Sequence, residues 1–255
     1  MLIAARLRIV LALLAVAGEG MQAQTTPPLP FAVGERLVYE GRVRGISGRG
    51  TMWIDGPVDV RGVSTLELHF DFAARVGPLS VTQKSTSWLD PQRMAAMRFE
   101  KRERNPLARR EEAIELYPDE RRWSGRDGEV GASPTSAPLD ELSFIYFVRT
   151  LPFTSDSTLR FERHFDLQRS PTLIRVAGRE QVETPAGSYA TVIVEMKVRD
   201  PQHYKGEGTI RFSISDDGCR LPVRIESKIP DAGTVVLTLA QAGGDSLCAS
   251  RLARR

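Results

Sequence analysis

Apolar and polar residues alternate with a period of two along most of this 255-residue chain, and no other feature constrains its fold as strongly. The alternation is clearest in residues 36–44 (RLVYEGRVR), 65–72 (TLELHFDF) and 209–215 (TIRFSIS). Successive side chains of a strand point to opposite faces, so each stretch makes one apolar and one polar face. The pattern predicts half-buried β-strands.

Turn sequences separate these stretches at short intervals, among them Asp55-Gly56-Pro57, Asp90-Pro91, Thr184-Pro185-Ala186-Gly187 and Asp216-Asp217-Gly218. Short connections make neighbouring strands antiparallel, because a parallel pair needs a long crossover. We count on the order of a dozen strands, and a sheet of that size curls or splits into two layers. The sequence therefore predicts an all-β, mainly antiparallel fold, a curved meander that closes toward a barrel, a half-barrel or a sandwich.

One segment departs from this pattern and predicts a short helix near residues 140–150. Asp140 is a suitable N-cap for a helix over residues 141–150 (ELSFIYFVRT), with Glu141 in the first turn and Arg149 in the last. Its apolar surface needs cover, and the concave side of a curved sheet supplies it. It is either an ordinary packing helix or a lid. The Gly-, Ser- and Pro-rich residues 124–138 before it could instead separate two half-domains.

The first 23 residues have the pattern of a secretory signal peptide. Arg6 and Arg8 precede an apolar run at residues 9–17, which is too short to span a bilayer. We expect cleavage near Ala23, a periplasmic or secreted product and no transmembrane segment in the mature chain. The expected organisation is a signal peptide at 1–23, a Pro-rich lead-in at 24–30, a single β domain at 31–245 and a C-terminal tail at 246–255.

Export places Cys219 and Cys248, the only two cysteines, where disulfides persist. Two predicted strands join at residues 230–232, and if Ile229 pairs with Gly233, Cys219 lies opposite Gly243. The chain turns back after that glycine and brings Cys248 within reach. We predict a disulfide between the two cysteines, with a pair of free thiols as the alternative.

The charge pattern argues against nucleic acid as a partner. The chain has 35 basic and 32 acidic residues, and even its most basic stretch, residues 98–122, interleaves eight cations with seven anions. A surface that follows phosphates needs uncompensated Lys and Arg on one face. Aromatic residues make up 7% of the chain, which is few for the two interfacial girdles of an outer-membrane barrel.

A search for catalytic motifs finds one constellation, the spacing E-x-H-x-D, which occurs twice: Glu67, His69 and Asp71, and Glu162, His164 and Asp166. On a strand each triplet shares one face, and two triplets facing one interior could hold Zn²⁺ or Mn²⁺. Apolar residues occupy the opposite face of each stretch, so solvated faces are the favoured interpretation. We therefore predict no catalytic residue, no metal and no cofactor.

Four clusters resemble a family of exported bacterial proteins known only as domain of unknown function three-one-zero-eight. Their residues include Gly34, Glu35 and Tyr39; Asp140, Ser143, Tyr146 and Arg149; Thr184 to Gly187; and Asp216, Arg220 and Pro222. Phe212 and Ile214 depart from the pattern, since members often carry Trp in that strand. The resemblance implies a predominantly β envelope protein with no established activity, and it transfers no catalytic residue.

Three functions remain as hypotheses. The leading one is a non-enzymatic module that binds a lipid or another apolar or amphipathic molecule in the curved sheet. The alternative is a structural module that holds an envelope protein through strand edges or loops. An enzyme that uses the histidine triplets is the third.

Overall fold

The computed structural model describes residues 28–43, 46–77, 79–106, 108–154, 158–202, 204–230 and 233–244. Within these residues fourteen strands form one antiparallel sheet. The strands are β1 (Arg36–Val43), β2 (Ile46–Val60), β3 (Val63–Val76), β4 (Leu79–Asp90), β5 (Ala95–Asn105), β6 (Ala108–Tyr117), β7 (Arg122–Gly125), β8 (Val130–Ala132), β9 (Thr158–Phe161), β10 (Thr172–Thr184), β11 (Gly187–Val198), β12 (Gly208–Ser215), β13 (Pro222–Ile229) and β14 (Gly233–Gly243). The expected signal peptide, Cys248 and the tail at 246–255 lie outside the described residues.

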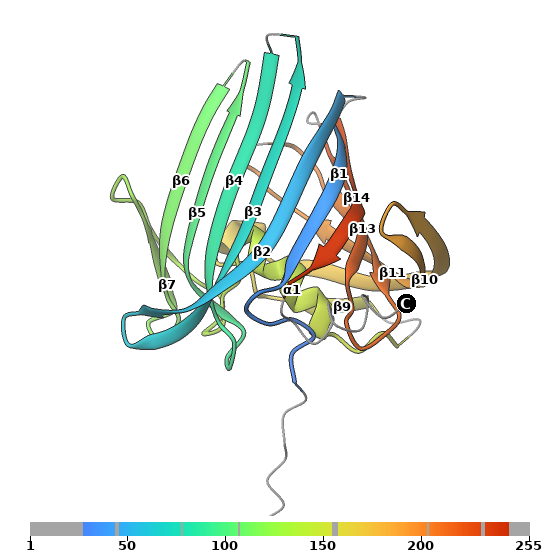
Figure 1. The fold of residues 1–255 in the computed structure, drawn as a ribbon. Coiled ribbons are helices and arrows are strands. Elements are labelled where there is room, and N and C mark those ends of the chain that lie inside the picture. Colours follow the sequence, from blue (N-terminus) through green and yellow to red (C-terminus); the bar gives the residue numbers. More distant parts are fainter. Residues whose placement is uncertain are drawn as a thin grey trace, which may run out of the picture.

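The sheet is a curved meander that stays open, which confirms the predicted fold class (Figure 1). Its order is β8 to β1 followed by β14 to β9, so β1 and β14, far apart in sequence, pair in its middle. We call β1–β8 the N-terminal wing and β9–β14 the C-terminal wing. The outermost strands, β8 and β9, have only 3 and 4 residues. The opening between them falls in the middle of the chain.

Two predicted hairpins have the expected register. The β13–β14 hairpin pairs Ile229 with Gly233 and Arg224 with Thr238, as the disulfide argument assumed. The β10–β11 hairpin pairs Thr184 with Gly187, whose φ of +127° suits glycine in a tight turn. The observed pairing ends at Arg224 and Thr238, before it reaches Cys219, and the disulfide itself stays a prediction.

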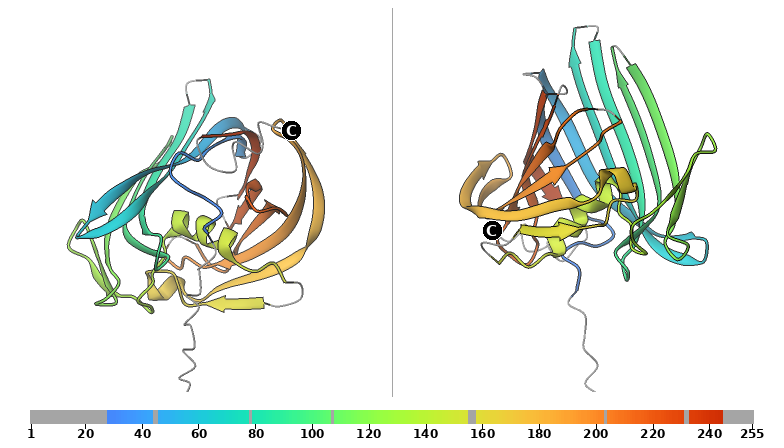
Figure 2. Two further views of the ribbon diagram at one scale, coloured as in Figure 1. Left: turned by 60° about the horizontal axis from the view of Figure 1, so that its bottom comes forward. Right: turned by 180° about the vertical axis from the view of Figure 1, so that it is seen from behind.

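The single α-helix of the described residues, α1 (Glu141–Thr150), has the predicted bounds. It lies between the two wings at one end of the curved sheet (Figure 2). Its apolar side chains join one hydrophobic core with residues of both wings, including Leu68 of β3, Phe99 of β5 and Phe212 of β12. The helix therefore covers the concave side of the sheet at that end, because its apolar surface and the inward faces of both wings bury one another.

A short 3₁₀ helix, η1 (Leu167–Arg169), follows β9 near the opening. Here residues before α1 and after β9 connect the two wings. Leu139 donates its N–H to the Arg163 carbonyl, and Phe165 donates to the Leu139 carbonyl. Ala96 at the start of β5 donates to the Pro138 carbonyl at 2.8 Å. The opening is therefore bridged at the α1 end by backbone hydrogen bonds.

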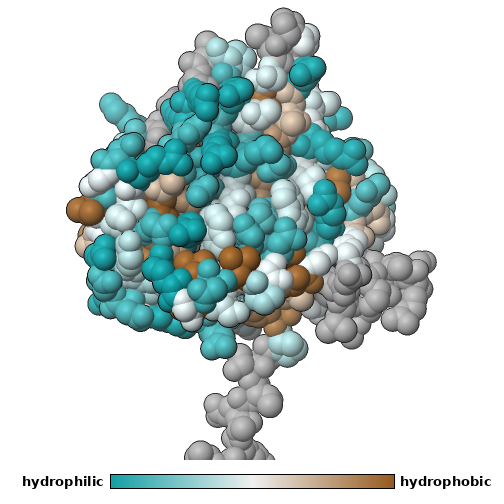
Figure 3. Space-filling model, turned by 60° about the vertical axis from the view of Figure 1, so that its left-hand side comes forward, coloured by the Kyte–Doolittle hydropathy of each residue, from teal (hydrophilic) through white to brown (hydrophobic). Residues whose placement is uncertain are grey.

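The outer face in Figure 3 is mostly hydrophilic, with hydrophobic residues in a narrow band across its lower half. The large apolar residues that are exposed in the described chain are Val33, Val130 and Leu167. No helix in the described ranges is long and apolar enough to cross a membrane.

Candidate functional site

The N-terminus of α1 is held by a buried carboxylate. Asp140 accepts hydrogen bonds from the Leu142 and Ser143 N–H groups at 2.9 Å, and the Ser143 hydroxyl accepts from the Asp140 N–H. Ser87 of β4 donates its hydroxyl to Asp140 Oδ2 at 2.5 Å. Burial raises the pKa of Asp140 to about 6. The cap predicted from the sequence therefore also fastens the helix to the N-terminal wing.

Substituting Asp140 with alanine should lower the free energy of unfolding by about 1–2 kcal/mol, because two helix N–H groups and the Ser87 hydroxyl lose their acceptor. Urea unfolding at pH 5 measures the effect. Asp127→Ala, in an exposed turn between β7 and β8, is the control and should change stability by less than about 0.5 kcal/mol. Equal losses in the two variants would contradict the capping role.

The C-terminal turn of α1 carries a fully buried arginine. Arg149 Nη1 and Nη2 contact the Glu35 carboxylate at 2.7 and 2.8 Å, and both side chains are at most 2% exposed. Nη2 also donates to the carbonyls of Pro30 and Cys219. Burial alone would lower the pKa of Arg149, but Glu35 outweighs it and raises the pKa. This bidentate pair joins α1 to the segment that precedes β1.

Three more residues of the resemblance surround this pair. Tyr39 donates its hydroxyl to the carbonyl of Pro222, the first residue of β13, at 2.9 Å. Tyr146 packs edge-on against Phe31 with ring centroids 5.0 Å apart. Arg220 donates to the carbonyls of Arg149 and Leu151 and so satisfies the C-terminal end of the helix. Burial raises the pKa of Tyr39 and of Tyr146 above the ordinary range.

We call these residues the helix anchor; they are Glu35, Tyr39, Asp140, Ser143, Tyr146, Arg149, Arg220 and Pro222. In the sequence these residues fall in three separate clusters, and the structure brings them together around α1. Gly34, with φ of +88°, opens the turn before Glu35. Gly187 and Asp216 belong to turns of the C-terminal wing, where Asp216 pairs with Arg179 at 3.1 Å. The anchor holds both ends of the helix, and within the described residues the Tyr146 hydroxyl and Arg149 Nε have no hydrogen-bond partner.

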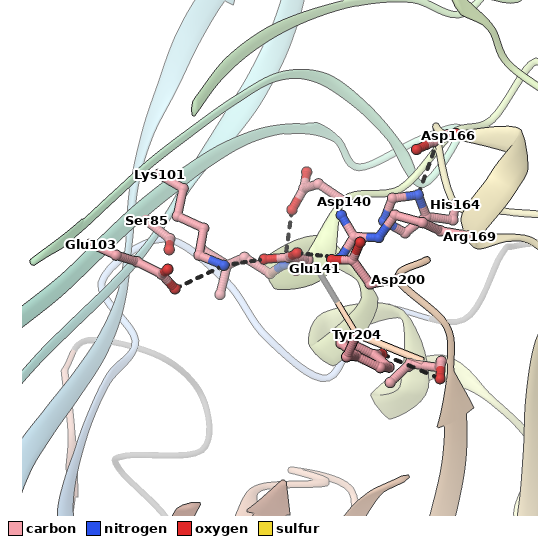
Figure 4. A network of polar contacts seen from close by, with 12 residues as sticks. Ser85, Lys101, Glu103, Asp140, Glu141, His164, Asp166, Arg169, Asp200 and Tyr204 are labelled. Atoms are coloured by element: carbon pink, nitrogen blue, oxygen red, sulfur yellow. Dashed lines mark hydrogen bonds and ion pairs between the residues drawn. The ribbon is translucent and has the colours of Figure 1, made fainter. Parts of the chain in front are cut away.

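A chain of charged side chains bridges the wings beside the helix (Figure 4). Glu103 and Lys101 of β5 lie 3.0 Å apart, and Lys101 contacts Glu141 of α1 at 2.9 Å. Glu141 pairs with Arg169 of η1 at 2.5 Å, and Arg169 lies 3.3 Å from Asp200, in the β11–β12 connection. We call these five residues the charge chain. Its charges alternate in sign from the N-terminal wing to the C-terminal wing.

Burial and the alternating charges shift pKa values along the charge chain. Burial alone would raise the pKa of Glu141, but Lys101 and Arg169 hold it well below its ordinary range. Burial alone would lower the pKa of Lys101 and of Arg169, and neighbouring carboxylates raise both instead. All three groups therefore stay ionised at neutral pH, which the sequence alone did not indicate.

His164 lies beside this chain and is buried, with 6% of its surface exposed. Its Nδ1 accepts the Asp166 N–H at 3.1 Å, and its Nε2 has no partner within the described part of the chain. Burial and Arg169 lower the pKa of His164 to about 3. The imidazole is therefore neutral at pH 7, with its proton on Nε2.

The first histidine triplet lies on the outer face of β3, as the solvated-face interpretation expected. His69 stacks on Trp53 with ring centroids 4.5 Å apart, and its Nε2 lies 3.4 Å from Asp55 and 3.9 Å from Glu67. Asp71 instead pairs with Lys84 at 3.3 Å. These contacts are ordinary cross-strand pairs.

The interpretation of the second triplet as one face of a strand is wrong. β9 ends at Phe161 because it pairs only with residues 172–175, so Glu162, His164 and Asp166 follow the strand. Glu162 is exposed and pairs with Arg160, His164 is buried, and Asp166 caps η1. No group of three metal-binding side chains forms within the described residues.

Beyond α1, toward the hairpin tips, the concave face is amphipathic. One cross-strand row follows Ile46, Val43, Val235, Ser227 and Ile210 from β2 to β12. Its four apolar members are only partly buried, whereas Leu239 and Phe212, nearer the helix, are fully buried. We call Ile46, Val43, Val235 and Ile210 the apolar row.

The neighbouring strands β4, β5 and β6 carry polar residues on the same face. Ser85, Lys101 and Glu112 lie opposite one another, and Ser85 lies opposite Phe70 of β3. The next cross-strand set is Gln83, Glu103 and Arg110. We call these six residues the polar rows. On β3 the row of Ser85 continues to Phe70, which pairs with Met52 of β2, six positions along that strand from Ile46. The polar rows and the apolar row therefore lie at different levels of the concave face.

Two hollows lie in the C-terminal half of the described chain. The space beside Leu151 and Phe153 at the end of α1 measures about 10 Å³, room for at most one water molecule. A cleft of about 640 Å³ lies at the tips of β12 to β14, lined by Glu207, Thr209, Lys228, Ile229, Pro230, Gly233 and Thr234. Thr209, Lys228 and Thr234 are cross-strand partners on the face opposite Ile210, Ser227 and Val235, so this cleft lies at the hairpin tips and mainly on the outer side of the sheet.

Comparison with known proteins gives a family and a fold. A family model described as a protein of unknown function (DUF3108) matches residues 39–240. A beta-barrel-like protein of domain of unknown function DUF1849 from Brucella abortus has a TM-score of 0.56 and 12% identity, covering 84% of this chain and 98% of its own. A candidate lipoprotein from Parabacteroides distasonis has a TM-score of 0.31, 11% identity, and coverage of 83% and 95%. No curated protein matches. The Brucella structure supports the fold alone.

Proposed function

The chain belongs to the DUF3108 family, and we propose that it is an exported, non-enzymatic envelope protein that binds an apolar or amphipathic molecule on its concave face. The observation that carries the proposal is the apolar row, whose side chains point inward yet stay partly exposed beyond the helix. An inward apolar surface that the chain does not cover itself is available to a ligand. Residues 31–245 act as one binding domain in this proposal.

Two further features support a binding role. The helix anchor fixes α1 at one end of the concave face, so that end is a closed floor. The other end has neither helix nor a pairing strand to close it in the described chain. Export is supported by the signal-peptide pattern of residues 1–23, and the expected compartment is the periplasm or the exterior.

The apolar row gives the test of this proposal. Val235 of β14 faces the concave side, and its neighbour Val236 faces outward between Arg42 and Glu226. Val235→Asp should weaken binding of the neutral apolar dye Nile red by about tenfold, because a carboxylate replaces the apolar contact. Val236→Asp is the matched control and should bind Nile red like the wild type.

Fluorescence titration of the purified mature protein measures the affinities, and urea unfolding confirms that both variants are folded. Absence of dye binding by the wild type would refute the proposal, as would equal weakening by both variants. Native mass spectrometry of protein purified from the periplasm gives a second readout, because a tightly bound natural ligand adds its mass to that of the chain.

The alternative function is a structural module to which a partner protein adds a strand. The edges of the sheet give it little support. Beyond its pairing with β7, which covers Ile114–Tyr117, β6 has an outer edge at residues 108–113 without a partner strand among the described residues. Charged side chains fill it: Arg109, Arg110, Glu111 and Glu112. Charge on an edge strand opposes pairing with another chain.

A further inference from the structure

The hairpin tips of the N-terminal wing carry an excess of arginine. The hairpins β1–β2, β3–β4 and β5–β6 all have their tips at the open end of the concave face, opposite α1 (Figure 1). The four strand residues on either side of each of these turns include, in total, seven arginines and three glutamates. The same count around the turns β2–β3, β4–β5 and β6–β7, at the α1 end, gives two arginines and three carboxylates. Positive charge is therefore concentrated at one end of the wing.

Five of the seven arginines are exposed and form no ion pair or side-chain hydrogen bond within the described ranges. We call these five the cationic rim; they are Arg42, Arg49, Arg75, Arg104 and Arg110. The glutamates beside the β5–β6 turn have other partners. Glu103 lies opposite Arg110 but pairs with Lys101, and Glu111 pairs with Arg109. The rim therefore keeps a net positive charge.

Two arginines at the tip of the β5–β6 hairpin lie directly opposite each other. Arg104 of β5 is the cross-strand partner of Arg109 of β6, and like charges in this position destabilise a sheet. A hydrogen bond from Arg109 lowers the pKa of the exposed Glu111, and Arg102 and Arg126 act in the same direction. Local sequence features that oppose the fold without an internal contact to offset them are expected where a surface binds a partner.

The cationic rim is wide enough to meet an extended surface. Its members lie on the strands β1, β2, β3, β5 and β6, which with β4 are consecutive in the sheet, and adjacent strands are about 4.8 Å apart, so the rim spans about 24 Å. Neighbouring hairpins lie about 10 Å apart, roughly one Debye length at ~0.1 M salt, and their fields therefore add. Because the charges stand at strand ends and follow no groove, a broad layer of phosphate groups matches them.

The apolar row reaches the same level of the sheet as the cationic rim. Val43 is the last residue of β1 and Ile46 is the first of β2, so the row includes the tip of the β1–β2 hairpin, next to Arg42. A lipid surface offers phosphate groups to the arginines and an apolar layer beside them to this row. Nucleic acid and acidic proteins offer the anionic charge without that layer. The combination of the two features therefore favours a lipid surface.

We infer that the cationic rim docks on an anionic lipid surface, with its arginines against the phosphate groups and the open end of the concave face toward the bilayer. Guanidinium groups bind phosphate through paired N–H donors. Each basic residue near an anionic membrane raises the affinity about fivefold. The inference goes beyond the proposed function, because docking by the rim does not require a ligand on the concave face. It also gives an amphiphile a path to the bilayer at the end that α1 leaves open.

Sedimentation of the intact mature protein with lipid vesicles tests this inference. At low salt the protein should bind phosphatidylcholine vesicles that contain about 30% phosphatidylglycerol at least about tenfold more tightly than pure phosphatidylcholine vesicles. Raising the salt to about 0.5 M should remove most of this difference. Arg75→Glu combined with Arg104→Glu should weaken binding to the anionic vesicles by at least about tenfold, because two attractive charges become repulsive. Neither arginine has an ion pair in the described chain, and urea unfolding confirms that the variant is folded.

Arg160→Glu combined with Arg179→Glu is the matched control, because it changes the net charge by the same amount on the other wing. Both arginines are exposed, lie on β9 and β10, and pair with Glu162 and Asp216. This variant should bind the anionic vesicles within about twofold of the wild type. Equal losses in the two double variants would overturn the inference, since net charge alone would then explain the binding.

The remaining outcomes separate a lipid surface from other partners and the inference from the proposed function. Equal binding of the wild type to both kinds of vesicle overturns the inference, as does tighter binding to duplex DNA at the same phosphate concentration. If Nile red binds but the anionic vesicles do not, docking fails and the proposed function stands. If the vesicles bind but Nile red does not, docking stands and the proposed function fails.

Discussion

Replacing Glu35 with leucine should lower the free energy of unfolding by about 3–5 kcal/mol, a large part of the stability of a domain. The substitution leaves the Arg149 guanidinium fully buried without its carboxylate. The backbone carbonyls of Pro30 and Cys219 are then its remaining acceptors, and neither carries the charge that offsets desolvation. Urea unfolding at pH 7, followed by fluorescence, gives the value.

A double-mutant cycle shows whether the loss comes from the buried charge. Glu35→Leu combined with Arg149→Met should recover most of the stability, because a buried pair replaced by apolar residues often costs little. Glu162→Leu is the surface control, since Glu162 and its partner Arg160 are both well exposed, and it should cost less than about 0.5 kcal/mol. Additive losses at Glu35 and Arg149 would show that the pair is not coupled.

The contacts of the buried pair give a physical reason why the residues of the family resemblance come from distant parts of the sequence. Glu35, Arg149 and Arg220 come from three regions of the sequence, yet each holds an end of α1 or the segment under it. The helix in turn fills the concave side at one end of an open sheet. The helix anchor therefore forms the floor of the proposed site. The surface proposed for the ligand consists of other residues of the concave face.

Local features of the fold could be predicted from the sequence. Period-two alternation located the strands, the Asp140 cap and the flanking turns located α1, and the turn at residues 230–232 set the β13–β14 register. Each depends on residues a few positions apart. The same reasoning works poorly for contacts between distant segments, which leave no periodic trace.

Pairings of distant residues were not foreseen. Nothing local indicates that β1 pairs with β14, or that Arg149 reaches Glu35. The interpretation of the second triplet failed for the same reason. Alternation in residues 158–166 continues past Phe161, but β9 ends opposite Thr172, where β10, its partner strand among the described residues, begins. His164 then turns into the core. One signal was available in the sequence, since Arg163 interrupts the expected apolar face between Phe161 and Phe165.

Lowering the pH from 7 to 4 should destabilise the protein through His164 by about 3 kcal/mol. The pKa of His164 is about 3 in the folded chain, below about 6.5 in an unfolded chain. The unfolded state therefore binds more protons between these values, and this contribution is complete above pH 6.5 and is lost as the pH falls toward 3. Asp140 has the opposite effect, because its folded pKa of about 6 exceeds its ordinary value of 3.8.

The contribution of His164 can be separated from that of Asp140 by comparing variants at both pH values. In His164→Gln the loss on going from pH 7 to pH 4 should be about 3 kcal/mol smaller than in the wild type, since glutamine cannot be protonated there. His69→Gln leaves the buried imidazole in place and should lose as much stability as the wild type. Urea unfolding of the three proteins measures the losses. Equal losses in His164→Gln and the wild type would mean that His164 is reached by solvent and protonated without unfolding. The burial of its side chain between β9 and the charge chain argues against that result.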